Sequence, residues 1–251
     1  MAHADRRIAL DLSWLLVFAG AFAGGFVSGL SGFGTGLVGM PFWLLAVPPV
    51  LAAQLAALSA VISQAQTLGT VRHALSWNHL APMTIAGLIG VPIGVWMLPH
   101  VPVTTFKTAI GVTLIVFCAF LLIGPGAWRL KQRYRLPELA MGLTGGFMGG
   151  LTGVPGPPVI MWGTIQSWSR EEKRALYQVF ILVVLFVMLI ASALFGQFSW
   201  DFGAGALIVA PATVIGAYCG AWVYRRVDDH RFDRLILVIL LLSGIGLIVG
   251  R

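Results

Sequence analysis

Long apolar stretches separated by short polar segments dominate the chain. From Leu12 to Val71, 60 consecutive residues contain no Asp, Glu, Lys, Arg or His. One helix crosses the hydrocarbon core of a bilayer in about 20 residues, so this run must fold back on itself. Six further runs lack these residues: Leu80–Pro99, Thr108–Trp128, Leu139–Ser169, Ala175–Trp200, Phe202–Tyr224 and Leu235–Gly250. The pattern predicts an all-α membrane protein.

Glycine and proline interrupt two of these runs. Leu139–Ser169 is too long for one span and too short for two, and it contains Gly153-Val-Pro-Gly-Pro-Pro158. Because glycine and proline at this density break a helix, we expect two short helices that meet inside the membrane. The first run is expected to divide similarly, with a broken or re-entrant pair over roughly Leu12–Val47, interrupted at Gly29–Gly36, and an ordinary span at Leu51–Thr70.

The two halves of the chain share three ordered motifs, which indicates an internal duplication. The matching pairs are Gly24–Gly32 with Gly145–Gly153, Ser76–Asn78 with Ser199–Asp201, and Ile89–Trp96 with Ile215–Trp222. Chance similarity between glycine-rich segments is the alternative. We predict a first repeat at 1–124, a basic cytoplasmic linker at 125–136 and a second repeat at 137–251. Each repeat holds a broken pair and three spans, about ten membrane segments in total.

Five segments per repeat is an odd number, so the second repeat should be inverted relative to the first. If the linker is cytoplasmic, 12 of the 16 Lys and Arg residues fall on the cytoplasmic side, as the positive-inside rule favours. Both termini then lie outside the cytoplasm. Arg170 and Arg72 fall near span ends and are predicted interface anchors. A signal peptide is the competing interpretation of the N-terminal segment.

Composition narrows the class of protein. Of 251 residues, 58% are hydrophobic and only 10% are charged, against about 25% charged in soluble domains. This excludes a soluble enzyme, a disordered tail and a nucleic-acid-binding module, despite the net charge of +7. The two cysteines, Cys118 and Cys219, lie in apolar runs and are predicted to be buried hydrophobic residues, and neither a metal nor a cofactor is expected.

The breaks are the candidate substrate site. A helix that starts there exposes backbone N–H groups and partial positive charge, which suit a small oxyanion. Glycine allows close approach of the ligand, and hydroxyl and amide groups add donors. Inverted repeats place such sites at their interface near mid-membrane. The candidate substrate-binding residues are Gly29, Ser31, Gly32, Gly34, Thr35, Gln54, Gly150, Thr152, Gly153, Gly156 and Gln178.

Small residues also let membrane helices touch, and we prefer that packing role for Gly90-xxx-Gly94 and Gly216-xxx-Gly220. The glutamines at 54, 64, 66 and 178 could contact substrate or bridge helices. The runs hold no charged residue, so a cationic substrate would meet no counter-charge. An anion, in contrast, can be held by dipoles and neutral donors.

The doubled glycine motif resembles the TauE/SafE sulfite-exporter family. The similarity rests on Gly24-Gly-Phe-Val-Ser-Gly-Leu-Ser-Gly-Phe-Gly-Thr-Gly36, the following Met40-Pro41, and its repeat after Leu139. It covers nearly the whole chain, from about 19 to 250. The resemblance implies a bacterial membrane carrier of sulfur-containing anions, with the glycine-rich segments around Ser31 and Thr152 as the substrate region.

The leading hypothesis is a secondary transporter in the bacterial inner membrane that exports sulfite, sulfoacetate or another organosulfonate by alternating access. Its expected partners are the small anion and the lipid bilayer, and a homodimer is left open. An anion channel is one alternative. The other is an intramembrane serine hydrolase, because Gly29-Leu-Ser31-Gly32 is a pattern that can present a nucleophile. We expect a protein that is not an enzyme.

Overall fold

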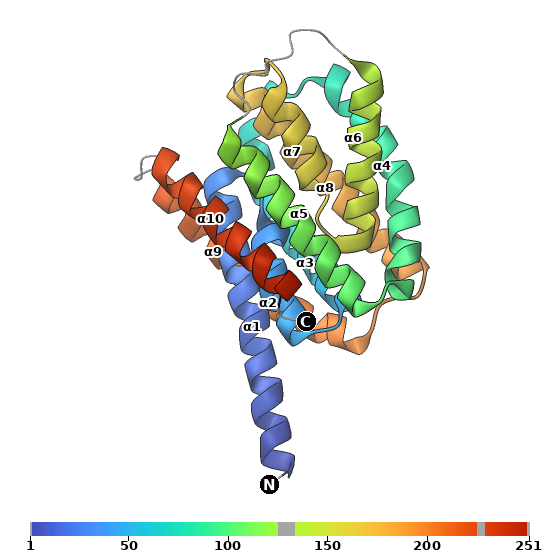
Figure 1. Ribbon diagram of the computed structural model, residues 1–251, viewed down its shortest axis with the longest axis vertical. Helices are drawn as coiled ribbons and strands as arrows, with labels where there is room; N and C mark the ends of the chain where they lie inside the picture. Colours follow the sequence, from blue (N-terminus) through green and yellow to red (C-terminus); the bar gives the residue numbers. More distant parts are fainter. Residues whose placement is uncertain (1, 125–133, 225–228, 250–251) are drawn as a thin grey trace.

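A computed structural model describes residues 2–124, 134–224 and 229–249, and their side chains except at 2–11, 70–72, 224, 229–236, 238 and 239. The described residues form α-helices and two short 3-10 turns, with no strand among them (Figure 1). Most of the predicted linker, at 125–133, lies outside them. The α-helices are α1 (Ala2–Ser31), α2 (Thr35–Ala46), α3 (Pro49–Val71), α4 (Trp77–Met97), α5 (Val103–Ile123), α6 (Arg135–Thr152), α7 (Gly156–Ile165), α8 (Arg170–Leu194), α9 (Trp200–Tyr224) and α10 (Asp229–Val249).

Both glycine-rich segments interrupt a helix where the sequence indicated. Gly32 and Gly34, between α1 and α2, have φ of 81° and 95°, and Gly153, after α6, has φ of 70°. A side chain costs roughly 1–2 kcal/mol in this left-handed conformation, so glycine permits the chain to leave the helix. The first pair differs from expectation in one respect: α1 has 30 residues and is not a short helix, since its helix extends beyond the apolar run to Ala2.

Six helices of the described chain are long and apolar enough to cross a membrane. They occupy Leu12–Ser31, Pro49–Gly69, Trp77–His100, Val103–Ile123, Arg170–Leu194 and Trp200–Val223. Shorter apolar helices cover Thr35–Ala46 and Leu240–Val249. The chain is therefore an all-helical, multi-pass membrane protein, while ten membrane segments and their inverted arrangement stay predictions.

Two interfaces between helices consist of backbone packed against backbone. α4 packs against α6, and α1 packs against α9. A Cβ built at Gly90 or Gly94 would collide with the carbonyl groups of Leu143 or Phe147 on α6, and one at Gly220 would collide with the Phe26 carbonyl on α1. We call these two interfaces the glycine seams. They confirm the packing role predicted for the glycines of α4 and α9.

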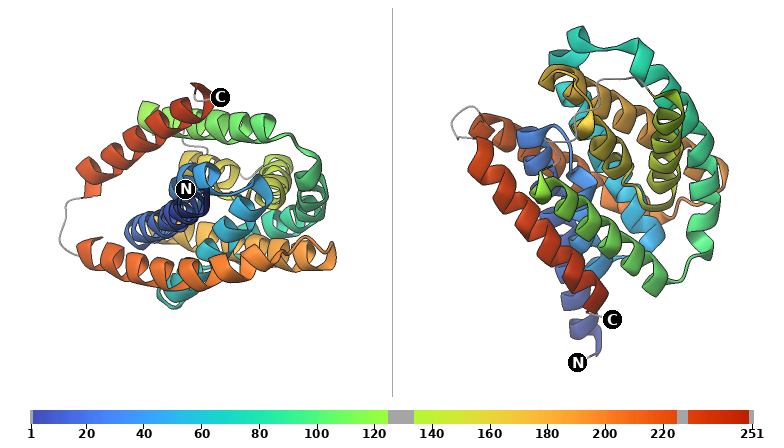
Figure 2. Two further views of the ribbon diagram at one scale, coloured as in Figure 1. Left: turned by 90° about the horizontal axis from the view of Figure 1, so that it is seen from below. Right: turned by 45° about the horizontal axis from the view of Figure 1, so that its top comes forward.

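The outer surfaces of α4 and α9 are apolar. Ile85, Ile89 and Trp96 of α4 are each about 60% exposed, and Leu207 and Tyr218 of α9 are at least 70% exposed. Cys219 of α9 is exposed as well, so the predicted burial is confirmed for Cys118 and wrong for Cys219. In Figure 2, α5 and α10 lie side by side along one edge of the molecule. Large apolar side chains on the periphery suit contact with lipid chains, which leaves the broken pairs, α3 and α8 to build the interior.

Candidate functional site

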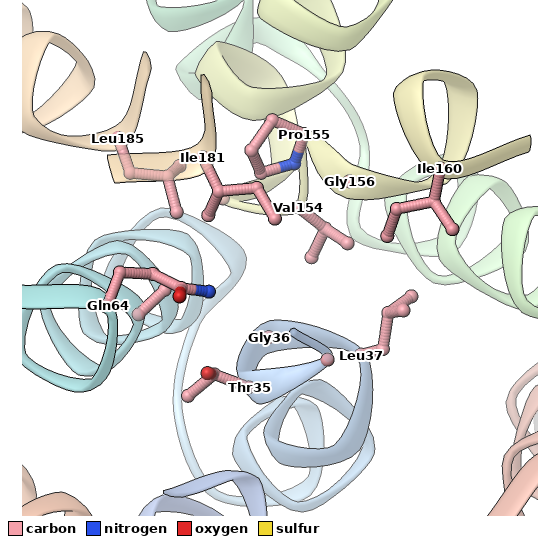
Figure 3. Close-up of a pocket in the computed structure, with 13 residues that line it drawn as sticks. Thr35, Gly36, Leu37, Gln64, Val154, Pro155, Gly156, Ile160, Ile181 and Leu185 are labelled. Atoms are coloured by element: carbon pink, nitrogen blue, oxygen red, sulfur yellow. The ribbon is translucent and has the colours of Figure 1, made fainter. Parts of the chain in front are cut away.

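The two breaks meet in the interior and line one pocket. Its wall combines Gly34–Leu37 at the start of α2 with Gly153–Gly156 between α6 and α7. A Cβ built at Gly36 would lie 3.1 Å from the Gly153 carbonyl oxygen and 3.1 Å from Val154 Cγ2, so the two breaks are in contact (Figure 3). The remaining lining residues are Ala60 and Gln64 of α3, Ile160 of α7, and Ile181 and Leu185 of α8.

The pocket is small and carries no charged side chain. The cavity has a volume of about 20 Å³, which is room for about one water molecule, so a larger solute fits only if the walls move apart. Its lining is glycine, aliphatic residues and proline, with Thr35 and Gln64 as the polar side chains. A solute held here would meet backbone dipoles and two neutral polar groups.

The start of α2 supplies the hydrogen-bond donors. Gly34 caps this helix without a side-chain hydrogen bond, and the first backbone bond, from the Val38 N–H to the Gly34 carbonyl oxygen, is 3.0 Å long. The N–H groups of Thr35, Gly36 and Leu37 therefore precede the first intrahelical bond. Because these three residues line the pocket, their N–H groups and the helix dipole favour negative charge in it.

The start of α7 faces the same pocket with fewer donors. Gly156 opens this helix, and Pro157 and Pro158 follow it. Proline has no backbone N–H, so the first turn of α7 keeps the favourable dipole but offers one amide donor, from Gly156. The expected grip on an anion from both sides is thus unequal, with α2 as the donor side.

Thr35 and Gln64 add polar groups to the wall. Thr35 is 1% exposed, and its hydroxyl lies 3.3 Å from Ser63 Oγ, which in turn contacts Ser28 Oγ. Gln64 is also 1% exposed, and its Oε1 has no hydrogen-bond partner among the described residues. Figure 3 shows its amide reaching into the gap between Thr35 and Ile181. A buried amide oxygen without a partner is costly, and because it only accepts hydrogen bonds, a ligand would have to donate to it.

A second polar group of residues surrounds Gly32, two residues before the pocket begins. A Cβ at Gly32 would lie 2.8 Å from Arg174 Nε and 2.8 Å from Gln178 Nε2. Gln178 is fully buried, and neither of its amide atoms has a partner among the described residues. The Phe33 ring packs edge-on against Tyr177, with centroids 6.3 Å apart, and so fixes this turn against α8.

Five of the eleven predicted residues take part in other contacts. Cβ atoms at Gly29 and Gly150 would collide with the Ala217 and Val91 carbonyl groups in the glycine seams. The Ser31 hydroxyl donates to the Val27 and Phe33 carbonyl oxygens, at 2.9 and 2.7 Å, and the Thr152 hydroxyl donates to the Met148 carbonyl oxygen. Gln54 Nε2 donates to the Gln197 carbonyl oxygen over 3.1 Å. None of the five lines the pocket.

The structure brings Gly34, Thr35, Gly153 and Gly156 together in the pocket and places Gly32 and Gln178 beside it. Gln64 and Arg174 are absent from the predicted set. The sequence alone does not distinguish Gln64 from the other glutamines in the apolar runs. Arg174 lies in a basic cluster at the end of a span, where an interfacial role is expected. The helical spacing of Arg174, Gln178, Ile181 and Leu185 along one face of α8 was the available signal.

Comparison with known proteins identifies the family of the chain. The comparisons with curated proteins and with solved structures give no significant match. A family model described as sulfite exporter TauE/SafE matches residues 16–247, nearly the whole chain. With its apolar helices, the chain therefore belongs to the TauE/SafE family of membrane transporters that export sulfite.

Proposed function

We propose that the protein is a secondary carrier that exports a small sulfur-containing anion, such as sulfite, sulfoacetate or another organosulfonate, by alternating access. The single observation that carries the proposal is the meeting of the two breaks. The N-terminal ends of α2 and α7 open on one uncharged pocket. Oriented dipoles and amide donors in a dry site bind an oxyanion without a buried cation.

The arrangement of helices supports an inverted duplication as the basis of this mechanism. If α1 to α5 correspond in order to α6 to α10, the contact between α1 and α9 corresponds to a contact between α6 and α4. Both contacts are present. The pairs α3–α8 and α5–α10, which this correspondence leaves unchanged, also pack together. In Figure 1, α1 runs upward and α6 runs downward. Rocking of one half against the other would then expose the pocket to either side of the membrane.

The membrane potential favours export of an anion. In a bacterial inner membrane that is negative inside, an anion that leaves the cell gains about 2.3 kcal/mol per charge for each 100 mV. Export therefore requires no proton relay in principle. In the proposed topology both termini and the loops opposite the linker face outward, so the substrate leaves on that side.

The contacts of Ser31 favour transport over hydrolysis. A nucleophilic serine donates its proton to a base within hydrogen-bond distance. The Ser31 hydroxyl instead donates to two backbone carbonyl groups beside the break, which suits a role in shaping the turn. Among the described residues, no group of three His, Cys, Asp or Glu is placed to hold a metal ion.

Flux measurements in proteoliposomes test the proposal. Sulfite, sulfoacetate, a second sulfonate, sulfate and acetate are compared, with and without a pH gradient. We expect saturable flux of at least one sulfur anion that is stimulated by counter-anion, which a channel would not show. Gly36→Ala, which brings a methyl group against Gly153, should lower the flux. Gly69→Ala, where a Cβ meets nothing within 4 Å, is the control, and a panel in which no sulfur anion moves would refute the proposal.

A further inference from the structure

One face of α8 links a basic helix end to the pocket. Arg174, Gln178, Ile181 and Leu185 follow one another at helical spacing, so they lie on a single stripe of the helix. Ile181 and Leu185 line the pocket, whereas Arg174 and Gln178 lie against Gly32. The rise from Arg174 to Ile181 is about 10 Å, so the guanidinium is separate from the pocket but close to it.

The Gly32 turn is shaped to receive these two side chains. Gly32 has a φ of 81° and is buried, and any side chain on it would occupy the place of Arg174 Nε and Gln178 Nε2. The absence of a Cβ therefore brings a guanidinium and an amide together at the backbone of the break. The same turn leads within two residues to Gly34, the first pocket residue of α2.

Gln178 indicates that this place holds a ligand. The side chain is fully buried, yet both atoms of its amide have no hydrogen-bond partner among the described residues. Leaving such a group unsatisfied is destabilising, and a leucine or methionine would fill the space without that cost. An oxyanion beside Gln178 would accept a hydrogen bond from Nε2 and satisfy it.

Arg174 supplies the charge that the pocket lacks. Its side chain is partly buried, and a planar guanidinium matches the oxygen pairs of a sulfite or sulfonate group. Arg170, one turn earlier on α8, is exposed. In the proposed topology this end of α8 faces the cytoplasm, from which an exported anion arrives.

We propose that Arg174 and Gln178, together with the Gly32 turn, form an outer anion-binding station through which the substrate reaches the pocket. The station rests on the proposed transport function and adds to it the residues that select for negative charge. An anion would first bind at Arg174, pass Gln178 along the α8 stripe, and then bind the N–H groups of Thr35, Gly36 and Leu37.

Transport kinetics of matched variants in proteoliposomes test the station. For sulfite, Arg174→Gln should raise KM by about tenfold, because it removes a charge-assisted contact. Arg170→Gln, the control on the same helix, should keep the wild-type KM. Arg174→Lys keeps the charge but loses the planar guanidinium, so its KM should lie between those of the wild type and Arg174→Gln. If Arg174→Gln does not fold, the KM of Arg174→Lys is the test of the station.

Gln178→Met separates a binding role from a structural one. Methionine fills a similar volume without polar atoms, so we expect a higher KM with an unchanged or raised melting temperature in detergent. A lower melting temperature with unchanged KM would show that Gln178 is structural and would overturn the station. Equal KM values for Arg174→Gln and Arg170→Gln, with normal wild-type flux, would also overturn it. A wild-type protein that moves no sulfur anion would overturn the proposed function itself.

Discussion

Two glutamines on α3 show how much a residue's role depends on its contacts. Gln54 and Gln64 are both 1% exposed. The amide of Gln54 donates to the Gln197 carbonyl oxygen, and Gln197 Nε2 donates to the Val95 carbonyl oxygen at 2.9 Å, so Gln54 connects α3 to the segment before α9. The Gln64 amide faces the pocket instead.

Replacing each glutamine by leucine should therefore give opposite results. Gln64→Leu removes a polar group from the pocket wall, and we expect the KM for sulfite to rise roughly tenfold. Its stability should hold, since Oε1 makes no hydrogen bond to a described residue that could be lost. Proteoliposome kinetics and thermal unfolding in detergent measure the two effects.

Gln54→Leu is the matched control on the same helix. It leaves the Gln197 carbonyl without its donor, and we expect a destabilisation of about 1–3 kcal/mol with an unchanged KM. If Gln54→Leu altered KM while Gln64→Leu did not, the assignment of the two residues would be reversed.

At the scale of the element, the glycine seams fix the positions of the breaks. α1 and α6 each carry a break at their C-terminal end, and each packs along its length against α9 or α4 through backbone contact. Trp43 of α2 donates from Nε1 to the Val17 carbonyl oxygen at 3.1 Å, and Tyr177 of α8 donates from its hydroxyl to the Ile160 carbonyl oxygen of α7 at 3.1 Å. Each half-helix beyond a break is thus anchored.

A methyl group in a seam should therefore destabilise the protein. In Gly220→Ala the new Cβ collides with the Phe26 carbonyl of α1, and we expect a loss of about 1–3 kcal/mol, seen as a lower melting temperature. Gly203→Ala, at the start of the same helix, meets nothing within 4 Å and should be neutral or slightly stabilising. Similar melting temperatures for the two variants would contradict the seam.

At the scale of the whole molecule, the proposed inverted duplication predicts which loops and termini lie on each side of the membrane. Arg170 and the linker should lie on the cytoplasmic side, together with most of the basic residues. The apolar outer faces of α4 and α9 then contact lipid, and the pocket lies between the two halves. In this proposed topology the substrate would enter along the face of α8 that carries Arg174 and Gln178 from the cytoplasmic side.

Cysteine labelling in cells tests this topology. In a background with Cys118 and Cys219 replaced by alanine, Gln132→Cys should react with a membrane-impermeant maleimide only after the cells are permeabilised. A cysteine added at the C-terminus should react in intact cells, because the proposed topology puts both termini outside the cytoplasm. Labelling of Gln132→Cys in intact cells would reverse the orientation.

The sequence determined which segments are apolar helices and where they break. Residue type alone explains this, since apolar runs predict spans and Gly32, Gly34 and Gly153 permit the left-handed turns that end them. The packing role of Gly90, Gly94, Gly216 and Gly220 followed from their spacing, and the family from the doubled motif.

The tertiary structure alone decided which residues of those segments share a pocket. Gly29 and Gly150 belong to the same motifs as the pocket glycines. They lie on a different face of their helices, however, and that face packs in the glycine seams. The roles proposed for Gln64, Gln178 and Arg174 depend on neighbours that are more than 25 residues away in sequence. A helical pattern fixes the face on which a residue lies, and only the packing of helices fixes what that face meets.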